Sequence, residues 1–127
     1  MSDASDLSGV WHGIFNYPHD LPPTEFVATL VEHHGGLSGE TEETDSDGRR
    51  LTALIHGQRT GSSIRFVKTY DDRHTHAVHY EGILDPEATE IAGTWRIPGS
   101  WSGAFVMVRP ADKAVEVERK VAESIGR

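Results

Sequence analysis

The chain has 127 residues, no cysteine and a formal net charge of -8. This length allows one domain with a buried core, because a domain of this size buries roughly two-thirds of its unfolded surface. The absence of cysteine excludes disulfides and thiolate chemistry, and the negative charge argues against nucleic acid or an anionic membrane as a partner. Met1–Asp6 is polar and acidic and no apolar run is long enough to span a bilayer, so a cytoplasmic location is expected.

The first predicted strand is Ser8–Tyr17, in which alternate residues share a face. One of its faces carries Trp11, Gly13, Phe15 and Tyr17. Prolines 18, 22 and 23 then prevent a regular ladder and make the first connection a long one. The segment Pro18–Pro23 is therefore predicted to be a semi-rigid gate over an open barrel mouth, with a plain surface connection as the alternative.

Two further strands are predicted at Thr24–His34 and Leu37–Thr44. The former is apolar on both faces, so its alternation does not say which face points inward. Gly35-Gly36 between them predicts a tight hairpin, because glycine reaches positive φ at little cost. The acidic stretch Glu40–Asp47 is interpreted as a solvated hairpin.

The rest of the strand pattern has the same form, with short polar turns between alternating segments. The predicted strands are Leu51–Arg59, Ser63–Tyr70, Thr75–Leu84, Glu90–Ile97 and Trp101–Arg109. Beyond Pro110 the spacing changes: Ala114, Val117, Val121 and Ile125 recur at a helical period. We therefore expect a barrel domain over residues 1–110 and a helical tail over residues 111–127.

Consecutive hairpins predict a meander, whose two edges are removed when the sheet closes. The predicted fold is all-β: a closed up-and-down antiparallel β-barrel of about eight strands with a short C-terminal helix. A Greek-key sandwich is the alternative, but it would need longer crossover connections than these turns provide.

Three features of the chain resemble the calycin superfamily of lipocalins, fatty-acid-binding proteins and avidins. They are Gly9-x-Trp11 in the first strand, the long loop that follows, and Arg109 at the end of the last strand. The resemblance implies that Trp11 plugs one end of the barrel and that Arg109 packs across it, an arrangement that cation–π attraction would stabilise.

Neither a cofactor nor a metal ion is predicted. Trp11-His12-Gly13 is similar to haem-binding barrels of the nitrobindin type, but these use a proximal histidine late in the chain, and no histidine follows His79. His74 and His76 share a face and His33-His34 point to opposite faces, so no compact set of metal ligands is evident.

The candidate ligand-binding residues are aromatic and polar side chains expected on the inner face of the barrel. They are Phe15, Tyr17, Phe26, Phe66, Lys68, Tyr70, Tyr80, Trp95 and Phe105. An inward Lys68 would need an anionic ligand or an internal carboxylate, because a buried charge is costly unless it is paired. The alternative places Lys68 at the rim with its ammonium group in water.

The leading hypothesis is a protein that binds a small, mostly apolar molecule inside the barrel, with an anionic group as one option. A second hypothesis is a barrel enzyme, an isomerase or cyclase, with an acid or base drawn from Lys68, Tyr70, Tyr80 or His56. A third is an interaction protein with a filled core. Trp101 is expected at a rim or in a subunit contact, which leaves a homo-oligomer open.

Overall fold

The computed structural model describes residues 6–18, 21–44, 47–70 and 77–110. The predicted C-terminal helix over residues 111–127 lies outside the described residues. No helix long and apolar enough to cross a membrane occurs among the described residues.

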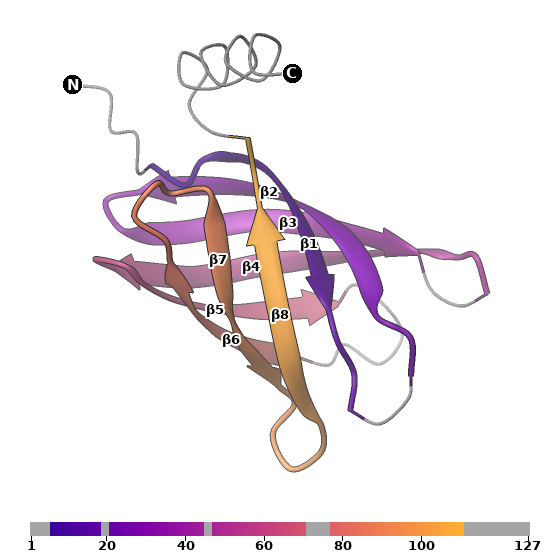
Figure 1. The fold of residues 1–127 in the computed structure, drawn as a ribbon. Helices are drawn as coiled ribbons and strands as arrows, with labels where there is room; N and C mark the ends of the chain where they lie inside the picture. The colour runs from indigo at the N-terminus through magenta and orange to yellow at the C-terminus, as the bar shows by residue number, and fades with distance from the viewer. Residues whose placement is uncertain (1–5, 19–20, 45–46, 71–76, 111–127) are drawn as a thin grey trace, which may run out of the picture.

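Eight antiparallel strands form one closed barrel in which every strand pairs with its neighbours in the sequence (Figure 1). The strands are β1 (Gly9–Phe15), β2 (Thr24–His33), β3 (Gly36–Thr44), β4 (Arg50–Thr60), β5 (Ser63–Tyr70), β6 (Ala77–Leu84), β7 (Glu90–Arg96) and β8 (Ser102–Val108). The barrel closes where β1 pairs with β8 over four positions, from His12 opposite Val108 to Phe15 opposite Phe105. The predicted closed up-and-down barrel is thus confirmed, and the predicted strand ends differ by only a few residues.

The pairing register determines which residues of β2 face the core. Phe26, Ala28 and Leu30 are buried, whereas Val27 and Val31 on the opposite face are 38% and 53% exposed. Both faces of this strand are apolar, so the distinction comes from its neighbours: Gly13 on β1 lies opposite Phe26. A side chain at Gly13 would overlap the Phe26 ring, so this glycine lets the ring lie inside the barrel.

The β2–β3 hairpin turns at His34-Gly35, one residue earlier than predicted. His33 pairs with Gly36, and His34 and Gly35 have φ angles of 52° and 83°. Positive φ at both positions is what a two-residue type I′ turn requires, and histidine tolerates it better than most side chains. The prediction that His33 and His34 point to opposite faces is wrong, because this turn brings their ring centroids within 4.2 Å.

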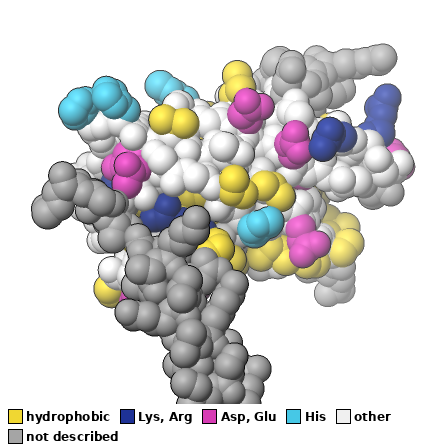
Figure 2. Space-filling view, turned by 90° about the horizontal axis from the view of Figure 1, so that it is seen from above, with side chains coloured by type: hydrophobic (Ala, Val, Ile, Leu, Met, Phe, Trp, Pro, Cys, Tyr) yellow, Lys and Arg dark blue, Asp and Glu magenta, His cyan; other side chains and the backbone are white. Residues whose placement is uncertain are grey.

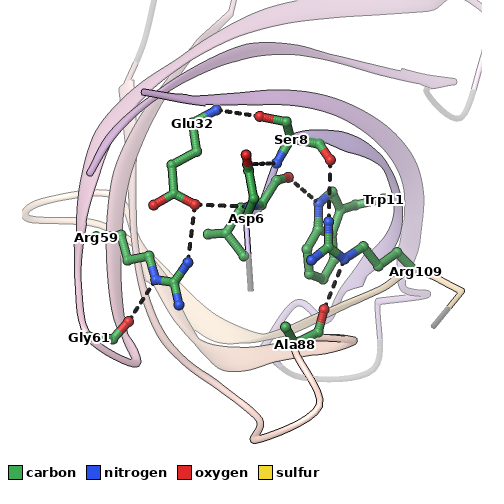
Figure 3. Close-up of polar contacts among 9 residues, drawn as sticks. Asp6, Ser8, Trp11, Glu32, Arg59, Gly61, Ala88 and Arg109 are labelled. Atoms are coloured by element: carbon green, nitrogen blue, oxygen red, sulfur yellow. Dashed lines mark hydrogen bonds and ion pairs between the residues drawn. The ribbon is translucent and has the colours of Figure 1, made fainter. Parts of the chain in front are cut away.

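One end of the barrel is closed by Trp11, which is fully buried. Its indole Nε1 donates a hydrogen bond to Leu7 O at 2.9 Å, and the Arg109 guanidinium lies 4.5 Å from the centre of its ring (Figure 3). Arg109 also donates hydrogen bonds to Ala88 O and Ser8 O. The predicted stacking of Arg109 on Trp11 is confirmed.

An ion pair that the sequence did not predict lies at the same end. Arg59 Nη1 on β4 lies 3.1 Å from Glu32 Oε1 on β2, and both side chains are largely buried. Glu32 Oε1 also accepts a hydrogen bond from Leu7 N (Figure 3). The segment before β1 is thereby held across the barrel end, because its backbone is bound to β2 as well as to Trp11.

The outer surface mixes apolar and charged side chains. Figure 2 shows one face on which hydrophobic side chains lie among acidic, basic and histidine side chains. Among the described residues, the large exposed apolar side chains are Val10, Leu21, Val27, Val31, Leu54, Ile83, Trp101 and Val108.

Candidate functional site

A buried polar cluster lies inside the barrel, toward the end opposite Trp11. Glu43 on β3 accepts two hydrogen bonds on the same oxygen, Oε1: one from Lys68 Nζ and one from Tyr70 OH, both at 2.8 Å. Lys68 is 1% exposed and Glu43 is 7% exposed. The two donors lie on β5, two residues apart and therefore on one face.

Four aromatic rings surround the Lys68 ammonium group. Nζ lies 4.8 Å from the ring centres of Phe15, Phe26 and Tyr70 and 5.7 Å from that of Tyr80. At these distances the electron-rich ring faces attract a cation, and the attraction strengthens when water is excluded. Glu43 and the rings together offset part of the cost of burying the charge.

Burial shifts the protonation equilibria of the cluster. Desolvation lowers the pKa of Lys68, and the attraction and hydrogen bond of Glu43 oppose this effect. Desolvation, reinforced by the negative charge of Glu43, raises the pKa of both Tyr70 and Tyr80 above the ordinary range. The raised pKa values favour the protonated form of both tyrosines, and Tyr70 OH donates its hydrogen bond to Glu43.

Two interpretations of the sequence are wrong at this cluster. The alternative that placed Lys68 at the rim fails because its ammonium group is enclosed. The acidic stretch Glu40–Asp47 is not uniformly solvated, because Glu43 points inward on the same face as Leu37 and Thr41. The alternation along β3 indicates that Glu43 faces inward, but the run of acidic residues around it favours a solvated hairpin.

An open pocket of about 950 Å³ lies at the mouth beside this cluster. Its apolar lining includes Tyr17, Leu21, Pro22, Pro23, Phe26, Leu51 and Trp101. Its polar lining includes His12, Thr24, Glu25, Glu42, Glu43, Thr44 and Arg50. Because Phe26 and Glu43 face inward whereas Glu25 and Glu42 face outward, the pocket extends from the barrel interior over the rim.

Aromatic side chains form one wall of the mouth. The Tyr17 ring makes edge contacts with Phe15, Trp95 and Trp101, at centroid distances of 5.2, 6.0 and 5.9 Å. Trp95 Nε1 donates a hydrogen bond to Asn16 O, which ties β7 to the end of β1. Trp101 is 44% exposed, as expected for a rim residue, and it lines the pocket although it was not among the candidate binding residues.

All nine candidate binding residues lie on the inner side of the barrel, but only Tyr17 and Phe26 among them line the pocket. Deeper in the barrel, Phe66 stacks on Tyr80 at 4.7 Å, and Phe105 meets Tyr80 edge-on at 4.9 Å. His56, a candidate acid or base, points outward and is exposed.

The described part of the chain contains no group of three or more histidine and acidic side chains placed to hold a metal ion. His74 and His76 lie outside the described residues, so the structure says nothing of their positions.

Comparison with solved structures finds the same β-barrel fold in designed proteins. A redesigned β-barrel superposes with a TM-score of 0.73 at 18% identity, covering 84% of this chain and 93% of the other. A second redesigned β-barrel, mFAP1 bound to DFHBI, superposes with a TM-score of 0.71 at 17% identity, covering 85% of this chain and 100% of the other. A designed fluorescence-activating barrel gives 0.64 at 16% identity, covering 86% and 99%. Neither a protein-family profile nor a curated protein sequence matches the chain.

Proposed function

We propose that this protein binds a small, mostly apolar molecule at the open mouth of the barrel. The observation that carries the proposal is the pocket itself: a volume of about 950 Å³ with an aromatic wall and one buried carboxylate in its lining. Ligand sites are typically concave, largely apolar and supplied with a few fixed polar groups. A similar barrel binds DFHBI, which supports the view that this architecture can hold a small molecule.

The ligand in this proposal needs no anionic group. An anionic ligand is one option from the sequence alone, because a buried Lys68 needs a counter-charge. Glu43 Oε1 supplies that charge at 2.8 Å, so the ammonium group is already paired. Of the candidate residues, Tyr17 and Phe26 are proposed to contact the ligand directly. Phe15, Lys68, Tyr70 and Trp95 are proposed to support the site, and Phe66, Tyr80 and Phe105 to form its packed base.

Native mass spectrometry of the protein purified from its own host tests this proposal. We expect a retained small molecule, and we expect Trp101→Ala to lose it, because that ring lines the pocket. Val31→Ala is the matched control, since Val31 is exposed but lies outside the lining. A protein that carries no molecule and binds no apolar alcohol, such as naphthylmethanol, would overturn the proposal.

A barrel enzyme is the second candidate function. It is favoured by the meeting of Glu43, Lys68 and Tyr70 in an apolar enclosure. The pKa values of Lys68 and Tyr70 are shifted there, and groups with shifted pKa values cluster at functional sites. Chemical conversion of the retained molecule by the wild type, and not by Tyr70→Phe, would favour this candidate.

The expected cytoplasmic location and the option of a homo-oligomer stay predictions.

A further inference from the structure

The buried carboxylate in the pocket lining uses only one of its two oxygens. Both donors, Lys68 Nζ and Tyr70 OH, bind Glu43 Oε1. No hydrogen bond between described residues uses the other oxygen, Oε2. A carboxylate has about four acceptor positions, so Glu43 retains the capacity to accept a hydrogen bond from a molecule in the pocket.

A second buried polar group lies beside Glu43 with its bonding incomplete. Thr41 is 1% exposed and lies two residues before Glu43 on the same inward face of β3. Its hydroxyl has no hydrogen-bond partner among the described residues. Buried hydroxyl groups are normally hydrogen-bonded. The Thr41 hydroxyl can therefore still form a hydrogen bond that the described residues do not supply.

The charged lining of the pocket is predominantly acidic. It contains three carboxylates, Glu25, Glu42 and Glu43, and one cationic side chain, Arg50. Arg50 pairs with Glu42 at 3.1 Å in an exposed position, and Glu43 pairs with Lys68. The described residues offer no ion-pair partner to Glu25. Among the described residues, the pocket lining therefore carries one carboxylate more than its ion pairs neutralise, in a chain whose net charge is itself -8.

We propose that the pocket selects an apolar amine, bound as its ammonium ion, in preference to a neutral or anionic molecule of the same shape. The ammonium group donates a hydrogen bond to Glu43 Oε2 and is attracted by Glu25. The apolar body packs on Tyr17, Phe26 and Trp101, whose ring faces also favour a cation. This inference rests on the proposed binding function and specifies its ligand class.

Three naphthalene compounds of similar size test the inference: naphthylmethylamine, naphthylmethanol and naphthoate. Their affinities are measured by isothermal titration calorimetry at neutral pH. We expect the amine to bind about tenfold more tightly than the alcohol, and the carboxylate to bind most weakly. The affinity of the amine falls with added salt, whereas that of the alcohol does not, because salt screens the attraction between exposed charges.

Two variants and one control separate the contributions of the carboxylates. Glu25→Gln removes an exposed charge without disturbing the core, and it lowers the preference for amine over alcohol. Glu43→Gln weakens binding of the amine more than binding of the alcohol, because a neutral amide is a poorer acceptor for an ammonium group than a carboxylate is. Glu40→Gln leaves all three affinities unchanged, since Glu40 is exposed on β3 and lies outside the pocket lining.

Different binding results would contradict the ligand class and the proposed binding function. If the alcohol binds and the amine binds no better, the ligand class is wrong but the pocket still binds. If the preference for the amine survives in both Glu25→Gln and Glu43→Gln, the assignment of these carboxylates as its cause is wrong. If none of the three compounds binds and purified protein carries no molecule, the binding function itself fails.

Discussion

At the scale of single residues, the Glu43–Lys68 pair is the most unusual feature of the barrel. Both ends are nearly inaccessible, and removing two charges from water costs several kcal/mol per ion. The attraction within such a pair recovers this cost only with good geometry and additional hydrogen bonds. Tyr70 supplies one of these bonds, so the three side chains form one unit.

Removing the cation alone therefore destabilises the fold. We expect Lys68→Met to lower the free energy of unfolding by about 3–5 kcal/mol, because Glu43 is left buried without its partner. The double variant Glu43→Gln/Lys68→Met recovers most of this loss, since the amide oxygen still accepts from Tyr70 OH. Urea denaturation of both variants measures the difference, and equal losses would show that the two side chains are not coupled.

The buried tyrosines make stability fall at high pH. Their native pKa values lie above the ordinary value of 10.0, so the folded state binds more protons than the unfolded state above that pH. Their stabilising contribution is complete below pH 10 and is lost as the pH rises further, by up to about 1.4 kcal/mol per pH unit for each group. The lowered pKa of Lys68 acts in the opposite direction, because stability rises as the pH approaches 10.5.

Denaturant melts of the wild type and of Tyr70→Phe/Tyr80→Phe above pH 10 test this expectation. The wild type loses stability more steeply, because only its unfolded state gains the two additional phenolate charges. Parallel curves for the two proteins would contradict the assignment of these tyrosines as protonated.

The sequence predicted part of this site. The inward direction of Lys68, Tyr70 and Phe66 follows from simple alternation along one strand. Glu43 was missed although the alternation of β3 places it on the inward face, because the buried charge is stabilised by Lys68, which lies 25 positions away in the chain. No local property of an acidic stretch indicates such a partner, and pairing between β3 and β4 and then β4 and β5 is needed to bring the two together.

At the scale of the elements, the barrel has two different ends. Trp11 and Arg109 close one of them, and we expect Trp11→Ala to cost about 3–5 kcal/mol as a truncation of a buried aromatic side chain. Trp101→Ala is the matched control at the open end. Its indole is 44% exposed, so its loss costs far less stability. Chemical denaturation of both variants measures the difference, and a loss well below 1 kcal/mol for Trp11→Ala would contradict the role of this residue as a plug.

We expect the loop before β2 to control entry to the pocket. Leu21, Pro22 and Pro23 line the pocket, which supports the predicted gate. We expect replacement of these three residues by glycine to change ligand association and dissociation rates more than thermal stability, because the loop adds no strand to the barrel. Stopped-flow binding and thermal melts measure the two effects. A large fall in melting temperature with unchanged rates would identify the loop as a brace.

The strands were predictable because each carries an alternating or β-branched segment with turn residues at its ends. For β2, alternation does not predict which face is buried. Val27 and Val31 are as apolar as Phe26 and Leu30, and only pairing with β1 and β3 decides which pair is buried. The turn at His34-Gly35 differs from prediction for a related reason, since strand register selects it over Gly35-Gly36.

At the scale of the whole molecule, the junction between β1 and β8 is the shortest in the barrel. It pairs four positions, whereas β6 and β7 pair six and β3 and β4 pair nine. It also joins the two segments that are farthest apart in the chain, so its closure carries the largest loss of chain entropy. We expect native-state hydrogen exchange to be faster for the amides of this junction than for those between β3 and β4.

The two ends of the described barrel lie close together at this junction, which makes the barrel suitable for circular permutation. Arg109 Nη1 contacts Ser8 O at 3.3 Å, so a linker of a few residues can join Pro110 to Asp6, and new chain ends can open at Gly61 in the β4–β5 turn. In the permuted chain β8 and β1 become a hairpin, while the former β4–β5 hairpin becomes the long-range contact. If closure of the β1–β8 junction limits the folding rate, the permuted barrel folds faster, because its last-formed contact then has eight paired positions to stabilise it.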